Sequence, residues 1–120
     1  NIVKSLTKNL PGEHFFINDE IDGNFPGHDP DPTDHKNLKQ LVEMVKSNKC
    51  DLGIAFDGDA DRIVVIDNLG RILAGDQLLT IFAEEIAKNY PSTTIIADVK
   101  TSQFFFDKVL ELGAKPLMWK

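Results

Sequence analysis

Three aspartates at alternate positions form the most chemically distinctive feature of this sequence. Asp57, Asp59 and Asp61 lie between two apolar segments, residues 52–56 and 63–66. In an extended backbone alternate side chains point the same way, so the three carboxylates can converge. Converging carboxylates repel one another, and a bound cation relieves that repulsion. Because oxygen ligands favour Mg²⁺ or Ca²⁺ over zinc or copper, the spacing predicts a hard-cation site.

An acidic hairpin turn without a metal is the alternative interpretation of these residues. Asp57-Gly58 is a strong turn signal between two strand-like segments. A calcium-binding EF-hand loop is excluded, because it needs glycine at its sixth position and glutamate at its twelfth. Counted from Asp57, those positions hold Arg62 and Asn68. The spacing alone therefore leaves both a cation site and a metal-free turn open.

Two basic residues add a second kind of chemistry. Arg62 follows the aspartates directly, and its planar guanidinium binds phosphate oxygens bidentately. An arginine held beside a carboxylate cluster suits a site that receives a phosphate. Lys100 comes just after the apolar segment 94–97, where α/β folds place their ligand sites. A lysine at that position also fits an ordinary solvated surface residue.

A further group of polar residues lies in a segment rich in glycine and proline, residues 18–34. It contains, or is followed directly by, these histidines and aspartates: His28, Asp29, Asp31, Asp34 and His35. Histidine and aspartate are metal ligands, but aspartates in such segments also form turns and cap helices. Thr33 or Asp34 is expected to cap the helix that follows.

The composition is that of an ordinary globular protein. The 120 residues are 42% hydrophobic and 27% charged, and the net charge of −6 argues against nucleic acid or an acidic membrane as the main partner. Cys50 is the only cysteine, which permits no intrachain disulfide and fits a reducing cytoplasm. No apolar run approaches membrane-spanning length, and no signal peptide is recognised.

Periodicity and turn residues predict helices and strands in alternation around these side chains. Helices are expected over residues 1–9, 34–49, 76–90 and 102–112. Strands are expected over residues 14–17, 52–56, 62–67, 71–73, 94–97 and 115–118. The inward face of the third helix is expected to carry Leu78, Leu79, Phe82 and Ile86. The alternation favours parallel α/β layers, with an antiparallel hairpin around the aspartate loop.

Four segments of the chain together resemble the α-D-phosphohexomutases, in particular the phosphomannomutase/phosphoglucomutase branch. They are Asp22-Gly23-Asn24-Phe25-Pro26 with His28 and Pro30-Asp31-Pro32, then residues 51–62, Asp98-Val99-Lys100, and residues 115–120. The aspartate loop is highly specific to this superfamily. At Ala60 the family often has glycine, although alanine is also common, and Asp29 replaces the second of two adjacent histidines.

The resemblance implies an α/β fold built of α/β/α layers with a mixed, mainly parallel sheet that is incomplete at both ends. Family members have four domains around a central cleft. Residues 1–70 would be most of the second domain, which carries the metal-binding loop, and residues 71–120 the beginning of the third. The phosphoserine of the first domain and the phosphate-binding loop of the fourth would lie outside this chain.

The resemblance also implies roles for individual residues. Asp57, Asp59 and Asp61 would bind Mg²⁺, whose remaining position goes to the phosphoserine. Arg62 and Lys100 would be catalytic, the arginine steadying the phosphate and the lysine reaching the reacting end of the sugar. The whole enzyme would interconvert the 1-phosphate and 6-phosphate of mannose or glucose through a bisphosphorylated sugar. Its partners would be hexose phosphates, with no nucleic acid and no membrane, in the cytoplasm.

Two other functions stay open at this point. One is a stand-alone aspartate-rich module that binds Mg²⁺ or Ca²⁺ without catalysis, and the other is an interaction domain whose acidic hairpin is incidental. If the chain is part of a phosphohexomutase, it is expected to lack mutase activity by itself, because it has no phosphoryl carrier. Its open sheet edges are expected to favour dimerisation.

Overall fold

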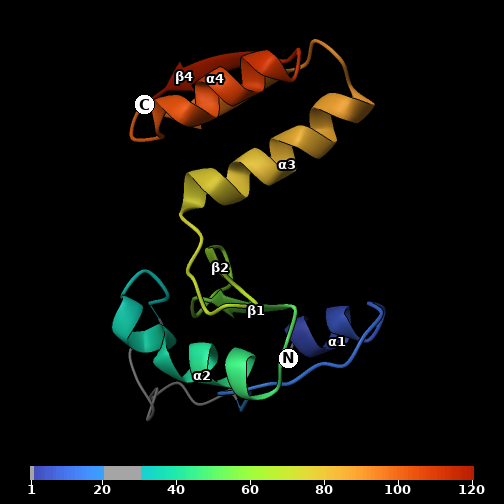
Figure 1. Ribbon diagram of the computed structural model, residues 1–120, viewed down its shortest axis with the longest axis vertical. Coiled ribbons are helices and arrows are strands. Elements are labelled where there is room, and N and C mark those ends of the chain that lie inside the picture. The colour runs from blue at the N-terminus through green and yellow to red at the C-terminus, as the bar shows by residue number, and fades with distance from the viewer. Residues whose placement is uncertain (1, 21–30) are drawn as a thin grey trace.

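The fold is described from a computed structural model, which covers residues 2–20 and 31–120. The helices are α1 (Ile2–Thr7), the 3₁₀ helix η1 (His35–Leu38), α2 (Lys39–Ser47), α3 (Gly75–Asn89) and α4 (Gln103–Glu111). The strands are β1 (Leu52–Phe56), β2 (Ile63–Asp67), β3 (Thr94–Asp98) and β4 (Lys115–Trp119). Figure 1 shows α1, α2, β1 and β2 in one half of the view and α4 with β4 in the other, with α3 between them.

The hairpin of β1 and β2 is the element that positions the aspartate loop. The strands pair antiparallel, with Leu52 opposite Asp67 and Phe56 opposite Ile63. Helix α2 covers one face, where Val45 is buried, and the absence of a side chain at Gly53 lets the helix lie close. The other face of β1 is exposed in this chain, although its continuous apolar sequence predicts burial on both faces.

The second sheet is a parallel β3–α4–β4 unit. Thr94 lies opposite Lys115 and Asp98 opposite Trp119. Helix α4 packs on this pair and supplies the largest core side chains. Gly113, with a positive φ of 78°, follows the end of α4 and lets the chain turn into β4. The buried cluster consists of Ala83, Ala87, Ala97, Phe105, Phe106, Val109 and Ala114. The opposite face of the sheet carries exposed apolar side chains, including Ile96 and Trp119.

The inward face of α3 differs from the prediction. Leu79, Ala83 and Ala87 face the core, whereas Phe82 and Ile86 are exposed. The helix has two apolar stripes, and the one with small alanines is packed because it leaves room for the phenylalanines of α4. Hydrophobic periodicity alone does not distinguish two such stripes.

The predicted strand over residues 14–17 is also wrong. Residues 13–16 have no regular secondary structure, and both Phe15 and Phe16 are exposed. Lys4 of α1 instead places its Nζ 5.5 Å from the centre of the Phe16 ring and pairs with Asp19. The segment is therefore held against α1 rather than in a sheet.

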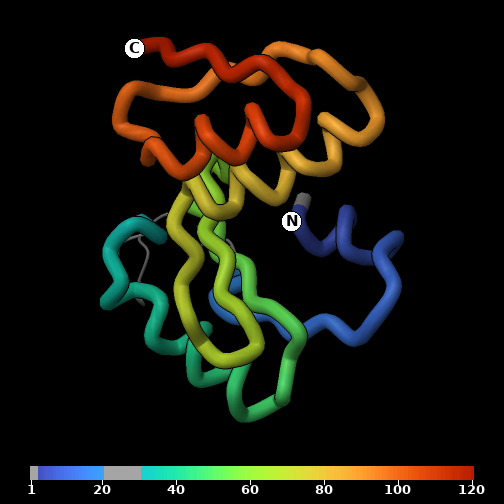
Figure 2. Tube along the Cα trace, turned by 45° about the horizontal axis from the view of Figure 1, so that its top comes forward, coloured from blue at the N-terminus to red at the C-terminus, as the bar shows by residue number. Residues whose placement is uncertain are grey.

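The expected strand over residues 71–73 is reduced to a single bridge between Ile66 and Ile72. Its hydrogen bonds join Asp67 N–H to the Arg71 carbonyl and Leu73 N–H to the Val65 carbonyl. This segment leads from the hairpin into α3, as the second view also shows (Figure 2). The remaining helices and strands agree with the sequence within a few residues, and the α/β class with both parallel and antiparallel pairing is confirmed. Across the described residues, none of the helices has the length and apolar character needed to cross a membrane.

Candidate metal centre

The aspartate loop is a tight connection between β1 and β2. Ala60 donates its backbone N–H to the Asp57 carbonyl at 3.2 Å, and Asp57 donates to the Arg62 carbonyl at 3.4 Å. Ala60 has a φ of 63°, in the left-handed region that an alanine rarely adopts. A glycine at this position would take that conformation without steric cost.

The three carboxylates converge, although the backbone between them is a turn and not the extended chain from which convergence was expected. Each of Asp57, Asp59 and Asp61 offers one oxygen that lies within 4.8 Å of the others. Ligand oxygens on opposite sides of Mg²⁺ or Ca²⁺ lie about 4–5 Å apart, from metal–oxygen distances of about 2.0–2.6 Å. Asp59 and Asp61 are exposed, so small rotations suffice to adjust them. The donor set therefore fits a hard divalent cation.

Asp57 is the buried member of the group and is held by Arg62. Its Oδ1 accepts from the Arg62 backbone N–H at 3.1 Å, and its Oδ2 accepts from Arg62 Nε at 2.6 Å. Burial disfavours the charged carboxylate, but the hydrogen bonds and charge of Arg62 outweigh it and lower the pKa of Asp57 to about 2. Asp57 is therefore ionised at neutral pH and presented in one orientation.

Asp61 shows the cost of crowding three carboxylates. A side-chain hydrogen bond with Asp57 raises its pKa, and the charges of Asp59 and Asp57 add to this. Arg62 acts in the opposite direction on Asp61 but does not cancel the effect. The cluster thus carries uncompensated negative charge, which a cation would relieve.

Arg62 also contacts a residue that sequence reasoning did not connect with it. Its Nη1 lies 3.3 Å from Asp31 Oδ1, and 54% of its side chain remains exposed. The sequence contains no signal for this pair, since 31 residues separate the two positions. Arg62 therefore bridges the hairpin and the segment that precedes η1.

Among the other described candidates, Asp31 reaches this centre through Arg62, whereas Lys100 does not contact it. No hydrogen bond or ion pair joins the exposed Lys100 to the three aspartates or to Arg62, all of which the structure describes. Asp31 accepts from Thr33 N–H and Asp34 accepts from Lys36 N–H, so both act as the turn and cap residues that were one of the expectations. His28, Asp29, Pro30 and the segment 22–26 lie outside the described residues.

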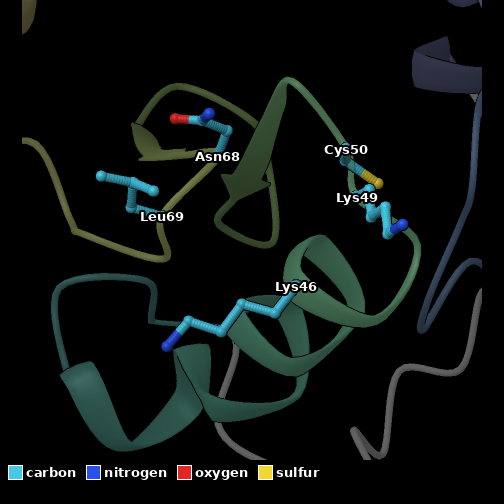
Figure 3. A pocket seen from close by; sticks show the side chains of 5 residues that line it. All are labelled: Lys46, Lys49, Cys50, Asn68 and Leu69. Carbon is cyan, nitrogen blue, oxygen red and sulfur yellow. The ribbon is translucent and has the colours of Figure 1, made fainter.

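A hollow of about 300 Å³ opens elsewhere, at the opposite end of the hairpin. Lys46, Lys49, Cys50, Asn68 and Leu69 line it, and the ammonium groups of the two lysines point to opposite sides (Figure 3). Cys50 precedes β1 whereas Asp57 follows it, so the hollow and the aspartates lie at opposite ends of a five-residue strand, which is about 17 Å long at about 3.3 Å per residue. It is therefore separate from the candidate metal centre.

Comparison with known proteins relates this geometry to one family. Residues 1–70 match the family model described as phosphoglucomutase/phosphomannomutase, alpha/beta/alpha domain II. A phosphomannomutase/phosphoglucomutase of Pseudomonas aeruginosa is 46% identical over 101 residues, which are 84% of this chain and 22% of the relative. A phosphomannomutase of Methanocaldococcus jannaschii is 42% identical over 110 residues, or 92% of this chain and 24% of the relative.

A solved structure agrees with these sequence matches. A phosphoglucomutase/phosphomannomutase family protein from Burkholderia thailandensis superimposes with a TM-score of 0.82 at 44% identity, over 84% of this chain and 22% of that one. The chain thus spans about a quarter of the length of the relatives it matches.

Proposed function

The chain belongs to the phosphoglucomutase/phosphomannomutase family, and from this premise we propose that it is the metal-binding part of a phosphohexomutase. The observation that carries the proposal is the convergence of Asp57, Asp59 and Asp61 beside an arginine that is hydrogen-bonded to Asp57. A phosphoryl-transfer site needs this combination of a cation held by carboxylates and a cationic fork for phosphate oxygens.

The proposed division into domains follows the chain order. Residues 1–70 belong to the second domain of the enzyme and carry the metal loop, and residues 71–120 begin the third. The match of residues 1–70 to a domain II model supports the first assignment. The change from the antiparallel β1–β2 hairpin, to which Ile72 still bridges, to the parallel β3–α4–β4 unit after α3 supports the second.

Each residue of the centre has a separate task in the proposed reaction. Asp57, Asp59 and Asp61 hold Mg²⁺, which when bound neutralises charge on the phosphoryl oxygens. Arg62 steadies the phosphate through the guanidinium N–H groups that its carboxylate partners do not use. Lys100 reaches the reacting end of the sugar and assists proton transfer there.

The proposed substrates are the phosphates of mannose and glucose, as the names of the relatives indicate. The enzyme interconverts the 1-phosphate and the 6-phosphate by passing a phosphoryl group from a phosphoserine to the sugar. The bisphosphorylated sugar then reorients and returns its other phosphoryl group to the serine. We place this metabolic reaction in the cytoplasm, which the single cysteine supports.

This chain by itself is proposed to be inactive and prone to dimerise. The phosphoserine belongs to a domain that lies outside residues 1–120. One face of each sheet is apolar and exposed here, with Ile54 and Phe56 on β1 and Ile96 and Leu117 on the β3–β4 pair. Such faces and unpaired edges favour association of two copies unless further chain covers them.

A chimera tests the proposed function. The corresponding 101 residues of the Pseudomonas aeruginosa relative are replaced by those of this chain, and turnover of mannose 1-phosphate and glucose 1-phosphate is measured with and without Mg²⁺. We expect Mg²⁺-dependent turnover that an Asp59→Asn chimera loses, and none from the 120-residue chain alone. A folded chimera that binds Mg²⁺ without turnover would instead favour the stand-alone binding module.

A further inference from the structure

Arg62 is anchored by two carboxylates that come from distant parts of the chain. Asp57 Oδ2 accepts from Arg62 Nε at 2.6 Å, and Asp31 Oδ1 accepts from Arg62 Nη1 at 3.3 Å. No other carboxylate of the described residues is closer than Asp61, whose Oδ1 lies 3.8 Å from Nε. Nη2 has no hydrogen bond or ion pair with any described residue and stays available to a ligand.

Asp31 is itself held in place before the arginine reaches it. Its Oδ1 accepts from the backbone N–H of Thr33 at 3.0 Å and from the Thr33 hydroxyl at 2.7 Å. Its carbonyl accepts from the side-chain amide of Asn37 at 2.9 Å, which ties it to η1. The hydrogen bonds of Thr33 and the charge of Arg62 lower the pKa of Asp31, so its carboxylate is charged.

Asp57 is shared between Arg62 and the candidate cation. Both of its oxygens accept hydrogen bonds from Arg62, and each keeps a second lone pair for a cation. A cation bound there repels the guanidinium, and more than half of the arginine side chain faces solvent. A second carboxylate, on Asp31, holds the guanidinium through another nitrogen, Nη1.

We propose that Asp31 is a positioning residue, which clamps the guanidinium of Arg62 so that its outer N–H groups face an incoming phosphate. The inference rests on the proposed function of the aspartate loop, and it adds a contribution from the segment before η1. The clamp makes phosphate binding depend on a residue that contacts neither the phosphate nor the metal.

The direction in which one substitution changes the affinity for phosphate distinguishes a positioning role of Asp31 from a simple effect of its charge. Neutralising a carboxylate near Arg62 strengthens the attraction of an anion if charge alone matters. Loss of the clamp weakens phosphate binding instead, because the arginine becomes mobile. Asp31→Asn keeps an oxygen for Thr33 but loses the charge, and Asp31→Ser keeps an acceptor for Thr33 but is too short to reach Arg62. Glu43→Gln on α2 is the matched control, since it removes an equal charge at an exposed position that has no hydrogen bond or ion pair with Arg62.

The experiment uses the full 120-residue chain at low ionic strength, with nuclear magnetic resonance to verify folding. The first measurement is the solvent-exchange rate of the Arg62 Nη–H groups, one of which donates to Asp31, without metal. The second is the affinity for inorganic phosphate in Mg²⁺. Asp31→Asn should speed exchange and weaken phosphate binding about threefold, Asp31→Ser more, and Glu43→Gln neither, a size consistent with an exposed ion pair.

A double-mutant cycle that combines the Asp31 substitutions with Arg62→Ala completes the experiment. In that background Asp31→Asn should not weaken phosphate binding, since the residue it positions is gone. Unchanged exchange in both Asp31 variants, or phosphate binding that stays the same or tightens, would overturn the proposal. If the unmodified chain binds neither Mg²⁺ nor phosphate, the proposed function fails, and the exchange rate alone then decides whether Asp31 positions Arg62.

Discussion

Asp57 and Arg62 close a ring of hydrogen bonds across the aspartate loop, because the carboxylate accepts from both the backbone N–H and the Nε of the same arginine. The pair joins the end of β1 to the start of β2, so these side-chain hydrogen bonds hold the loop closed in addition to the pairing of the strands. The two other carboxylates of the loop, on Asp59 and Asp61, have no comparable restraint and are exposed. The centre therefore has one fixed ligand and two adjustable ones.

The first prediction concerns the adjustable ligands. Asp59→Asn should lower the affinity of the chain for Mg²⁺ on the order of tenfold, because ligand charge sets the affinity of such sites. Its fold should be unchanged, since the side chain is exposed. Isothermal titration with Mg²⁺ measures the effect, with Glu43→Gln as a control of equal charge. Equal affinities of Asp59→Asn and the unmodified chain would remove Asp59 from the centre.

The second prediction concerns the backbone of the loop. Ala60 has a φ of 63°, which costs an L-residue about 1–2 kcal/mol, whereas glycine adopts this conformation freely. Ala60→Gly should raise the free energy of unfolding by about 1 kcal/mol, after allowance for the greater entropy of glycine in the unfolded chain. Urea denaturation provides the measurement.

Ala55→Gly is the matched control for the loop substitution. Ala55 lies inside β1 and is not among the residues with a positive φ, so glycine brings no steric relief there and should lower stability by about 0.5–1 kcal/mol. A loss of stability in both variants would show that Ala60 is not strained.

The sequence predicted the parts of this fold that depend on local pattern. The hairpin strands follow from two apolar segments flanking Asp57-Gly58, whereas the three aspartates converge through the turn between the strands and not through alternation in an extended backbone. Contacts that depend on tertiary packing could not be predicted from the sequence. Nothing in the spacing of Asp31 and Arg62 indicates their contact, which exists because η1 and α2 bring residue 31 to the hairpin.

Tertiary packing also explains why the predicted inward face of α3 was wrong. Phe82 and Ile86 are larger and more apolar than the alanines of the other α3 stripe, so burial of the phenylalanine stripe was the natural prediction. Helix α4 contributes Phe105 and Phe106 to the same core, and only a stripe of small residues leaves room for them. The exposed stripe also shows that apolar character alone does not imply burial within this chain.

The third prediction tests how closely α2 packs on the hairpin. A Cβ at Gly53 would lie 2.6 Å from Val45 Cγ2 and 3.2 Å from Leu41 Cδ1, and Val45 has no free space to move because it is buried. Gly53→Ala should therefore lower the free energy of unfolding by about 1–3 kcal/mol, the usual cost of overpacking. Thermal and urea denaturation measure the change.

Two further variants locate the cause of that loss. Gly53→Ala combined with Val45→Ala should be less destabilised than the sum of the single variants, since the second change removes the clashing methyl group. Gly75→Ala, where a Cβ meets no atom within 4 Å, should be neutral or stabilising. Strict additivity of the Gly53 and Val45 changes would contradict the proposed clash.

The fourth prediction is a dependence of stability on pH at the other end of the hairpin. Asp67 Oδ1 accepts from the backbone N–H of Arg71 at 2.8 Å and of Leu69 at 3.0 Å, and its Oδ2 accepts from Arg71 Nε at 2.6 Å. The backbone hydrogen bond of Arg71, followed by its side chain and by Leu69, lowers the pKa of Asp67 below its ordinary 3.8, although partial burial opposes this. A lowered pKa in the folded state stabilises the fold above the unfolded-state value, and this contribution is lost as the pH falls through the folded-state value.

Asp67→Asn should therefore be less stable than the unmodified chain at pH 7, and the difference should shrink as the pH falls below about 4. The difference between the two proteins is the informative quantity, because several other aspartates of the chain have lowered pKa values and are common to both. Urea denaturation at a series of pH values between about 2.5 and 7 measures it. Glu43→Gln, which removes an exposed carboxylate from α2, should show no comparable narrowing. A difference for Asp67→Asn that stays constant across the series would mean that the charge of Asp67 does not stabilise the turn, leaving only the shape of its side chain as the cause.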